Sequence, residues 1–195
     1  MEATIDVTPA GPSDWDDVES VFMTVASARN CWCQFHVLEN STARMTNRQS
    51  RRKLLVEQIS TLEPGRGLLA RSEDGPVGWC GVEPRNRLRH VLASKLVRST
   101  SPYPREDPGV WAVYCLLVPP EKRRLGIGSQ LLSAAVDHAR RAGGWAMEGY
   151  PIDTAQRGGE LPPGFSTGTL DMFEDAGFEP VESLPSGRTL VHRPI

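Results

Sequence analysis

The sequence predicts a single α/β domain over residues 1–195, with helices packed on a mixed β-sheet. Three observations lead to this prediction. The chain begins with an alternating strand pattern and an amphipathic helix, it continues into a hairpin, and a long apolar strand then runs into another amphipathic helix and a further strand. A hairpin forms an antiparallel strand pair, whereas a strand, a crossover helix and a strand form a parallel one, so the sheet is mixed.

Length and composition are those of an ordinary globular protein. The 195 residues are 39% hydrophobic and 24% charged, so the chain can bury a core. The formal net charge is -2, and the chain therefore lacks the basic excess that is typical of nucleic-acid-binding proteins. No secretory signal and no membrane-spanning apolar run are evident. With four cysteines, this predicts reduced thiols and a cytoplasmic protein without membrane or nucleic-acid partners.

The first half of the chain predicts a strand, two helices and a hairpin. Residues 3–10 alternate apolar and polar side chains, as a half-buried strand does. Residues 11–26 have apolar side chains at helical spacing, with Ser13 as the expected N-cap. Residues 47–60 predict a second helix, and residues 66–85 predict two strands around a turn.

The second half predicts the strand and helix that surround the most unusual junction of the sequence. Residues 110–118 are almost entirely apolar and predict a buried strand, and residues 129–144 predict a helix with one apolar stripe. A basic insertion precedes this strand. The remaining expected elements are a short helix at 88–97, a strand at 145–153, a helix at 169–177, and strands at 178–183 and 188–193.

The junction between the apolar strand and its helix reads RRLGIGS and has the composition of an anion site. Glycine lets a ligand approach the backbone closely, and a helix that begins there presents unpaired N–H groups and the positive end of its dipole. Arg123 and Arg124 add positive charge. We therefore expect a diphosphate to bind at this junction.

Three anion-binding motifs compete for the junction. A Walker loop needs Lys and then Ser or Thr after its last glycine, but Ser129 and Gln130 follow Gly128. A dinucleotide fingerprint needs a third glycine where Leu131 stands. The segment resembles instead the Arg/Gln-x-x-Gly-x-Gly/Ala signature of the GNAT acetyltransferases. A later segment, MFEDAGFEPV at 172–181, resembles the helix–Gly–Phe element of the same family.

The resemblance implies a mostly antiparallel mixed sheet in which the strand at 110–118 bulges and separates from its neighbour at 145–153. It also implies acetyl-CoA as the acyl donor, with the diphosphate on the main-chain amides of the junction. A backbone N–H near Leu116 would stabilise the reaction's oxyanion. The donor-binding residues implied are Leu116, Leu117, Val118, Arg123, Arg124, Leu125, Gly126, Ile127, Gly128 and Ser129.

The sequence departs from the family's pattern at the positions where relatives carry a general base. The positions at which relatives carry a Glu or His on the central strand correspond to Ala112 and Tyr114, and only Tyr114 could relay a proton, with packing as its alternative. Glu148 on the neighbouring strand is a candidate base, with a plain solvent-facing role as the alternative. His36 is the other candidate, on a segment that could reach the cleft.

The group that would protonate the leaving thiolate departs from the pattern as well. Many relatives use a Tyr at the position of Phe173, which has no proton to give. Ser166 stands where relatives often have an Asn that contacts coenzyme A. Either Ser166, Thr167 or water would donate the proton, or the thiolate would leave unprotonated, since free thiols titrate near ~8.5.

The segment RNCWCQFHVLEN at 29–40 has no clean period and predicts a loop or a distorted helix end. Cys31, Cys33 and His36 could contribute to a metal site, but no fourth ligand is evident and the Cys-x-Cys spacing is short, so we expect no metal. The Cys-Trp-Cys motif, together with the Glu-Gly-Tyr-Pro at 148–151, resembles a bacterial subgroup of the GNAT proteins.

The acceptor side is expected to be a small aromatic slot. Its candidate residues are Trp32, Phe35, His36 and Tyr150, with core anchoring as the alternative for the first two. We therefore expect an N-acetyltransferase that acts on a small amine or an amino-acid-like metabolite. The alternatives are a protein N-terminal or lysine acetyltransferase and a catalytically silent module that binds acyl-CoA. The sequence leaves the oligomeric state open, with a homodimer as one option.

Overall fold

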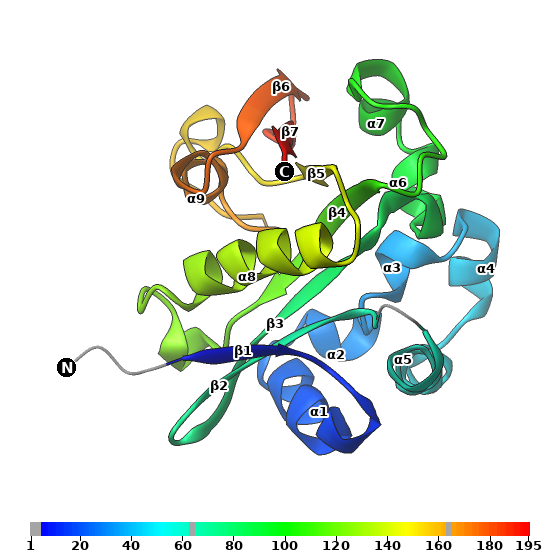
Figure 1. The fold of residues 1–195 in the computed structure, drawn as a ribbon, viewed down its shortest axis with the longest axis vertical. Coiled ribbons are helices and arrows are strands. Elements are labelled where there is room, and N and C mark those ends of the chain that lie inside the picture. Colours follow the sequence, from blue (N-terminus) through cyan, green and yellow to red (C-terminus); the bar gives the residue numbers. More distant parts are fainter. Residues whose placement is uncertain (1–4, 63–64, 163–164) are drawn as a thin grey trace.

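The computed structural model describes residues 5–62, 65–162 and 165–195. Within these residues, seven strands form one sheet in the order β1-β2-β3-β4-β5-β7-β6 (Figure 1). Only β4 and β5 pair in parallel, which confirms the mixed, mostly antiparallel α/β fold. The strands are β1 (Asp6–Pro9), β2 (Gly67–Ser72), β3 (Gly75–Pro84), β4 (Val110–Leu117), β5 (Ala146–Gly149), β6 (Glu179–Ser183) and β7 (Thr189–Pro194).

Helices cover both faces of the sheet, with one hydrophobic cluster under each layer (Figure 1). One face carries α1 (Trp15–Thr24), α2 (Ala28–Cys31) and α5 (Arg48–Thr61); the other carries α8 (Ile127–Arg141) and α9 (Leu170–Asp175). The shorter helices are α3 (Gln34–Val37), α4 (Asn40–Met45), α6 (Arg89–Ala93) and α7 (Lys95–Thr100). Single 3-10 turns occur at Pro12–Asp14, Arg85–Arg87, Pro120–Lys122 and Ala155–Arg157.

The expected helices at 11–26 and 129–144 are present, with one correction at an end. Helix α8 buries its whole predicted stripe, Leu131, Leu132, Ala135, Val136 and Ala139. The N-cap of α1 is Asp14, and the prediction of Ser13 is wrong because Ser13 lies inside the 3-10 turn before the helix. The Asp14 side chain accepts a hydrogen bond from the Gly11 N–H, which fixes that turn.

Two consecutive left-handed residues explain why the segment 29–40 has no clean period. Trp32 has φ of 50° and Cys33 has φ of 59°, so the chain breaks between the one-turn helices α2 and α3. This backbone region is costly for residues other than glycine. The Trp32 ring offsets that cost by stacking on Phe22, with ring centroids 5.1 Å apart, in the middle of the core.

The central strand β4 bulges at Tyr114. Across from β4, Gly81 pairs with Cys115 and Val82 pairs with Val113, so Tyr114 has no partner residue on β3. The pairing of β4 with β5 ends at Val113 and Gly149. Beyond this point the two parallel strands separate, as the resemblance implied, and main-chain groups of β4 are left without a neighbouring strand.

Candidate active site

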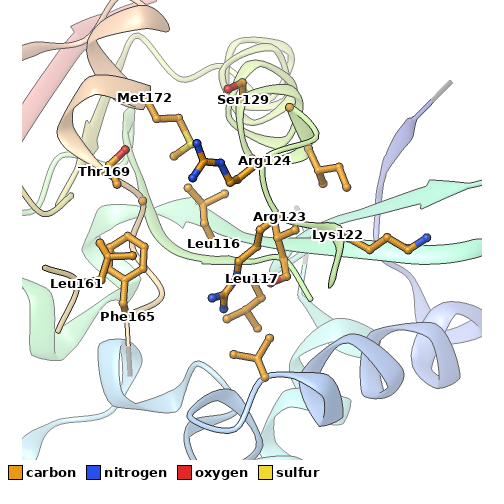
Figure 2. Close-up of a pocket in the computed structure, with 16 residues that line it drawn as sticks. Leu116, Leu117, Lys122, Arg123, Arg124, Ser129, Leu161, Phe165, Thr169 and Met172 are labelled. Atoms are coloured by element: carbon orange, nitrogen blue, oxygen red, sulfur yellow. Dashed lines mark hydrogen bonds between the residues drawn. The ribbon is translucent and has the colours of Figure 1, made fainter. Parts of the chain in front are cut away.

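A cavity lies where β4 separates from β5 and the chain turns into α8 (Figure 2). Every residue that the sequence analysis assigned to the acyl donor lines it, except Leu125. The Leu125 side chain is 63% exposed and lies outside this cavity, because the turn directs it away. The lining residues are Val25, Leu116, Leu117, Val118, Lys122, Arg123, Arg124, Gly126, Ile127, Gly128, Ser129, Leu161, Phe165, Gly168, Thr169 and Met172.

The turn leaves the main chain open toward this cavity. Arg124 has φ of 64° and Gly126 has φ of 75°, and a Cβ added at Gly126 would meet no atom within 4 Å. Helix α8 has no side-chain cap, and its first backbone hydrogen bond runs from the Gln130 N–H to the Gly126 carbonyl. The amides of residues 127–129 therefore precede the helix's hydrogen bonding and can bind an anion.

Positive side chains and an apolar wall complete the cavity. Arg123 extends toward Leu161 and Phe165, and Arg124 extends toward Met172 (Figure 2). Among the described residues, neither arginine forms an ion pair, and the Arg123 Nε donates only to the Val118 carbonyl, at 3.2 Å. An unpaired positive charge beside free amides, facing an apolar wall, fits a ligand with a diphosphate and an apolar arm.

The main chain of Leu116 is already engaged. Its N–H donates to the Ser166 carbonyl at 2.6 Å, across the gap left by the separated strands. The GNAT resemblance implied that an N–H near Leu116 stabilises the oxyanion. This N–H is not free in the structure, so a thioester carbonyl could use it only by displacing the Ser166 carbonyl.

A second cavity, of about 280 Å³, adjoins the first and shares Leu117 with it. Phe35, His36 and Ser166 line it, as does Thr167. Arg188 also lines this cavity, whereas no carboxylate among the described residues does. The other lining residues are Phe22, Ser27, Ala28, Cys31, Cys33 and Cys115.

His36 is the titratable base in this second cavity. Burial, and to a smaller extent the positive charge of Arg188, lower its pKa to about 4. The imidazole is therefore neutral at pH 7 and carries a lone pair that can accept a proton. Its ring lies 5.7 Å from the Tyr114 ring, centroid to centroid.

Glu148 lies outside both cavities, in a buried ion pair. Its side chain is 0% exposed, which excludes the solvent-facing alternative. One carboxylate oxygen accepts from the Arg85 Nη1 at 2.7 Å and from the Ser101 hydroxyl, and the other accepts from the Tyr150 hydroxyl at 2.9 Å. Both oxygens are thus occupied by side chains from three different segments.

Three other predicted site residues are buried away from the cavities. Trp32 is a core residue because it stacks with Phe22, and Tyr150 binds Glu148. Tyr114 is fully buried, and burial raises the pKa of its hydroxyl well above the usual range. Since none of the three lines either cavity, the structure does not bring them to an acceptor.

Tyr114 lies beside a second buried ion pair that the sequence did not reveal. The Arg66 Nη1 is 2.7 Å from a Glu83 carboxylate oxygen, but the two groups are poorly aligned for a hydrogen bond. Burial raises the pKa of Glu83 to about 7, although Arg66 acts in the opposite direction. This carboxyl, on β3 and fully buried, therefore titrates near neutral pH.

Phe173 packs in the core and reaches neither cavity. Its ring centroid is 5.1 Å from that of Phe178, and a Cβ at Gly149 would clash with it. By contrast, Ser166 and Thr167 line the second cavity, and the Thr167 hydroxyl accepts a hydrogen bond from Arg188. The hydroxyls that could replace the missing Tyr are thus at the cavity.

Sequence reasoning missed two sets of cavity residues. Leu161, Phe165 and Met172 of the first cavity lie in or after a Gly/Pro-rich loop, where no periodic pattern signals position. Cys115 of the second cavity lies on β4, and Arg188 stands immediately before β7. The only sequence signal for Arg188 was its positive charge at the start of the last expected strand, and arginines are common on protein surfaces.

The described residues add three further facts. None of their helices is long and apolar enough to cross a membrane. No three of their His, Cys, Asp or Glu side chains are grouped so that they could hold a metal ion. Cys31, Cys33, Cys80 and Cys115 are all free thiols.

Comparisons with known proteins give a family and a fold. The model of the acetyltransferase (GNAT) family matches residues 32–148. No curated protein is similar enough in sequence to count as a match. The element order and the separated central strands agree with the GNAT resemblance, whereas nothing found bears on the bacterial Cys-Trp-Cys subgroup.

Solved structures resemble the whole chain at low sequence identity. A GCN5-related N-acetyltransferase from Kribbella flavida has a TM-score of 0.61 at 18% identity, covering 98% of each chain. PaiA N-acetyltransferase from Thermoplasma acidophilum, in complex with coenzyme A, has a TM-score of 0.58 at 12% identity, covering 98% of this chain and 99% of its own. A mosquito arylalkylamine N-acetyltransferase like 5b has a TM-score of 0.60 at 12% identity, covering 98% of this chain and 100% of its own.

Proposed function

Because the chain belongs to the GNAT acetyltransferase family, we propose that residues 1–195 form one domain that transfers an acetyl group from acetyl-CoA to the amine of a small molecule, either a simple amine or an amino-acid-like metabolite. Acetyl-CoA as the donor agrees with the coenzyme A bound in related structures. The observation that carries the proposal is the meeting of the two cavities at Leu117. A donor in one and an amine in the other would then come together where the central strands separate.

In this proposal the turn at residues 123–129 holds the donor. The amides of 127–129 and the guanidinium groups of Arg123 and Arg124 bind the diphosphate. The apolar residues along β4 and the opposite wall contact the pantetheine arm. Holding the thioester beside the second cavity supplies the proximity that an acyl transfer requires.

His36 is the proposed base, because it lines the acceptor cavity with an unprotonated imidazole. A Lys-like amine titrates near ~10.4, so the reaction needs a group that accepts its proton. Glu148, the other candidate, is proposed to act by positioning, since its ion pair with Arg85 ties β5 to the segment after β3. Ser166 and Thr167 remain the proposed proton donors for the leaving thiolate.

Specific observations favour a second candidate function, a silent module that binds acyl-CoA. Phe173 and Ala112 are both fully buried and offer no group for proton transfer. A protein acetyltransferase is less favoured, because the described lining of the acceptor cavity has a cation and no carboxylate to attract a lysine-bearing segment.

The experiment is an acetylation screen of small primary amines with the purified chain and acetyl-CoA, read by mass spectrometry of the products. Acetylated product that depends on His36, with at least a tenfold lower rate in His36→Asn, supports the proposed function. Binding of acetyl-CoA without turnover of any amine would support the silent module instead.

A further inference from the structure

Arg188 is the one positively charged side chain of the acceptor cavity whose charge does not depend on pH, within the described lining. It stands immediately before β7, and its guanidinium is partly buried. Burial lowers the pKa of Arg188, but an arginine titrates far above neutral pH and stays charged. A cation in a cavity lined mainly by apolar side chains and thiols favours an anion beside it.

The guanidinium has a free edge. Its Nη1 donates to the Tyr150 carbonyl at 2.7 Å and to the Thr167 hydroxyl at 3.1 Å. Among the described residues, no hydrogen bond or ion pair uses the Nε or the Nη2. Two bonds from one nitrogen therefore fix the plane of the group, and the Nε–Nη2 edge is left as a fork of the kind that binds a carboxylate through two parallel hydrogen bonds.

Size and charge restrict what could occupy the cavity. A volume of about 280 Å³ is below the usual range for drug-sized ligands, about 300–1,000 Å³, so the occupant is a small molecule. His36 is neutral at pH 7, and no described lining residue is acidic, so nothing in the lining attracts an acceptor with a second amine.

We infer that Arg188 binds a carboxylate of the acceptor, so that the enzyme acetylates small amino acids rather than simple amines. This inference rests on the proposed function and adds the substrate class to it. The carboxylate would lie on the Nε–Nη2 edge of Arg188, and the amine would point to the junction with the donor cavity at Leu117. Arg188 is then a residue that determines specificity.

The same contact would make His36 a better base. Besides burial, the positive charges of Arg188, just before β7, and of His90 in α6 lower the pKa of His36, and the neutral Tyr114 ring of β4 lies 5.7 Å from its ring. A carboxylate on Arg188 would cancel most of that positive field. Binding of the correct acceptor would thus raise the proton affinity of His36 where the amine must lose its proton.

The test compares matched acceptors on the wild-type enzyme and on Arg188→Met. The probes are α- and ω-amino acids, each paired with its carboxamide, which keeps the amine and removes the negative charge. We expect kcat/KM to be about 100-fold higher for the best carboxylate than for its carboxamide, and Arg188→Met to lose that preference. Arg188→Lys should recover part of it, because it restores the charge without the fork.

Controls separate specificity from folding. Arg157→Met removes a half-buried arginine of the same region that donates to the Ser186 carbonyl and lines neither cavity, so its preference should match wild type. Acetyl-CoA affinity should be unchanged in Arg188→Met. Equal rates on carboxylates and carboxamides in the wild type, or an unchanged preference in Arg188→Met, would overturn the inference.

A binding measurement keeps the inference testable if no amine is turned over. The probes are then N-acetylated amino acids and their carboxamides, titrated into the protein with coenzyme A present. Carboxylate binding that Arg188→Met abolishes would support the inference even though the proposed acetyl transfer had failed. Absence of carboxylate binding in a protein that binds coenzyme A would overturn the inference and leave the donor site intact.

Discussion

The Leu116 N–H donates a hydrogen bond of 2.6 Å to the Ser166 carbonyl, across the gap between the separated strands. This bond places the loop before α9 over the edge of β4 at which the family resemblance puts the thioester. Because one N–H cannot serve both carbonyls at full strength, binding of the acetyl group and this bond compete. The loop and the acyl donor are therefore coupled at one amide.

We predict that acetyl-CoA and coenzyme A shift the Leu116 amide resonance differently in protein labelled with ¹⁵N-leucine. Only acetyl-CoA has a thioester carbonyl that can replace the Ser166 carbonyl. The Leu132 amide, inside α8, serves as the control and should respond alike to both ligands. Identical Leu116 shifts in the two complexes would show that the acetyl group does not reach this N–H.

We predict that Glu148→Gln lowers the free energy of unfolding by about 3–5 kcal/mol, because it leaves the Arg85 cation buried without its partner. Tyr150→Phe keeps the ion pair and loses one hydrogen bond to Glu148, so it should cost only about 1–2 kcal/mol. Urea unfolding measures both.

The kinetics of folded Glu148→Gln separate positioning from base catalysis. If Glu148 only positions β5, the residual activity should keep the shape of the wild-type pH profile. A profile that flattens in this variant would instead identify Glu148 as the base and remove His36 from that role.

We predict that Glu83 makes the protein less stable as the pH rises from 4.5 to 7. Its folded-state pKa, about 7, lies above its ordinary value of 4.5 because of burial, so the unfolded state releases the proton first. Each pH unit within this window costs at most about 1.4 kcal/mol. His36 acts in the opposite direction, since its lowered pKa of about 4 favours the folded state as the pH rises toward 6.5.

A comparison with Glu83→Gln isolates the Glu83 contribution from that of His36. The difference in unfolding free energy, wild type minus variant, should fall between pH 5 and pH 8 in urea titrations. Glu182→Gln, at an exposed position of β6, should show no such change. A Glu83→Gln difference that is constant or rises with pH would contradict the raised pKa.

The sequence was informative wherever a function depends on contiguous residues. The turn at 123–129 carries its own glycines, arginines and helix start, so its role follows from local chemistry. The family signature assigns the main chain of Leu125 to the donor, but it does not indicate that its side chain is directed away from the cavity by a turn that contains two left-handed residues. The acceptor cavity was less predictable, since His36 and Arg188 are far apart in the sequence and line the same cavity only in the folded chain.

Buried ion pairs were the features that sequence reasoning could not assign. Glu148 in an apolar strand suggests a catalytic carboxylate, but its partner Arg85 lies 63 residues earlier and nothing in the local pattern joins them. Trp32 has an aromatic side chain of the kind that often lines a binding site, yet the left-handed turn at 32–33 directs it into the core. In both cases tertiary packing decides which of two plausible roles the side chain takes.

The most direct test of the donor site is calorimetric titration of acetyl-CoA into the wild type, Gly126→Val and Gly143→Val. Both glycines have left-handed backbones, φ of 75° and 82°, with open space at the Cβ, and they stand at opposite ends of α8. The valine should therefore strain both variants alike, but only at Gly126 would it enter the diphosphate's place. We predict that the wild type and Gly143→Val bind with equal affinity and that Gly126→Val binds at least tenfold more weakly, about 1.4 kcal/mol. No heat from the wild type, or equal affinity in all three proteins, would contradict the assignment of this turn to acetyl-CoA.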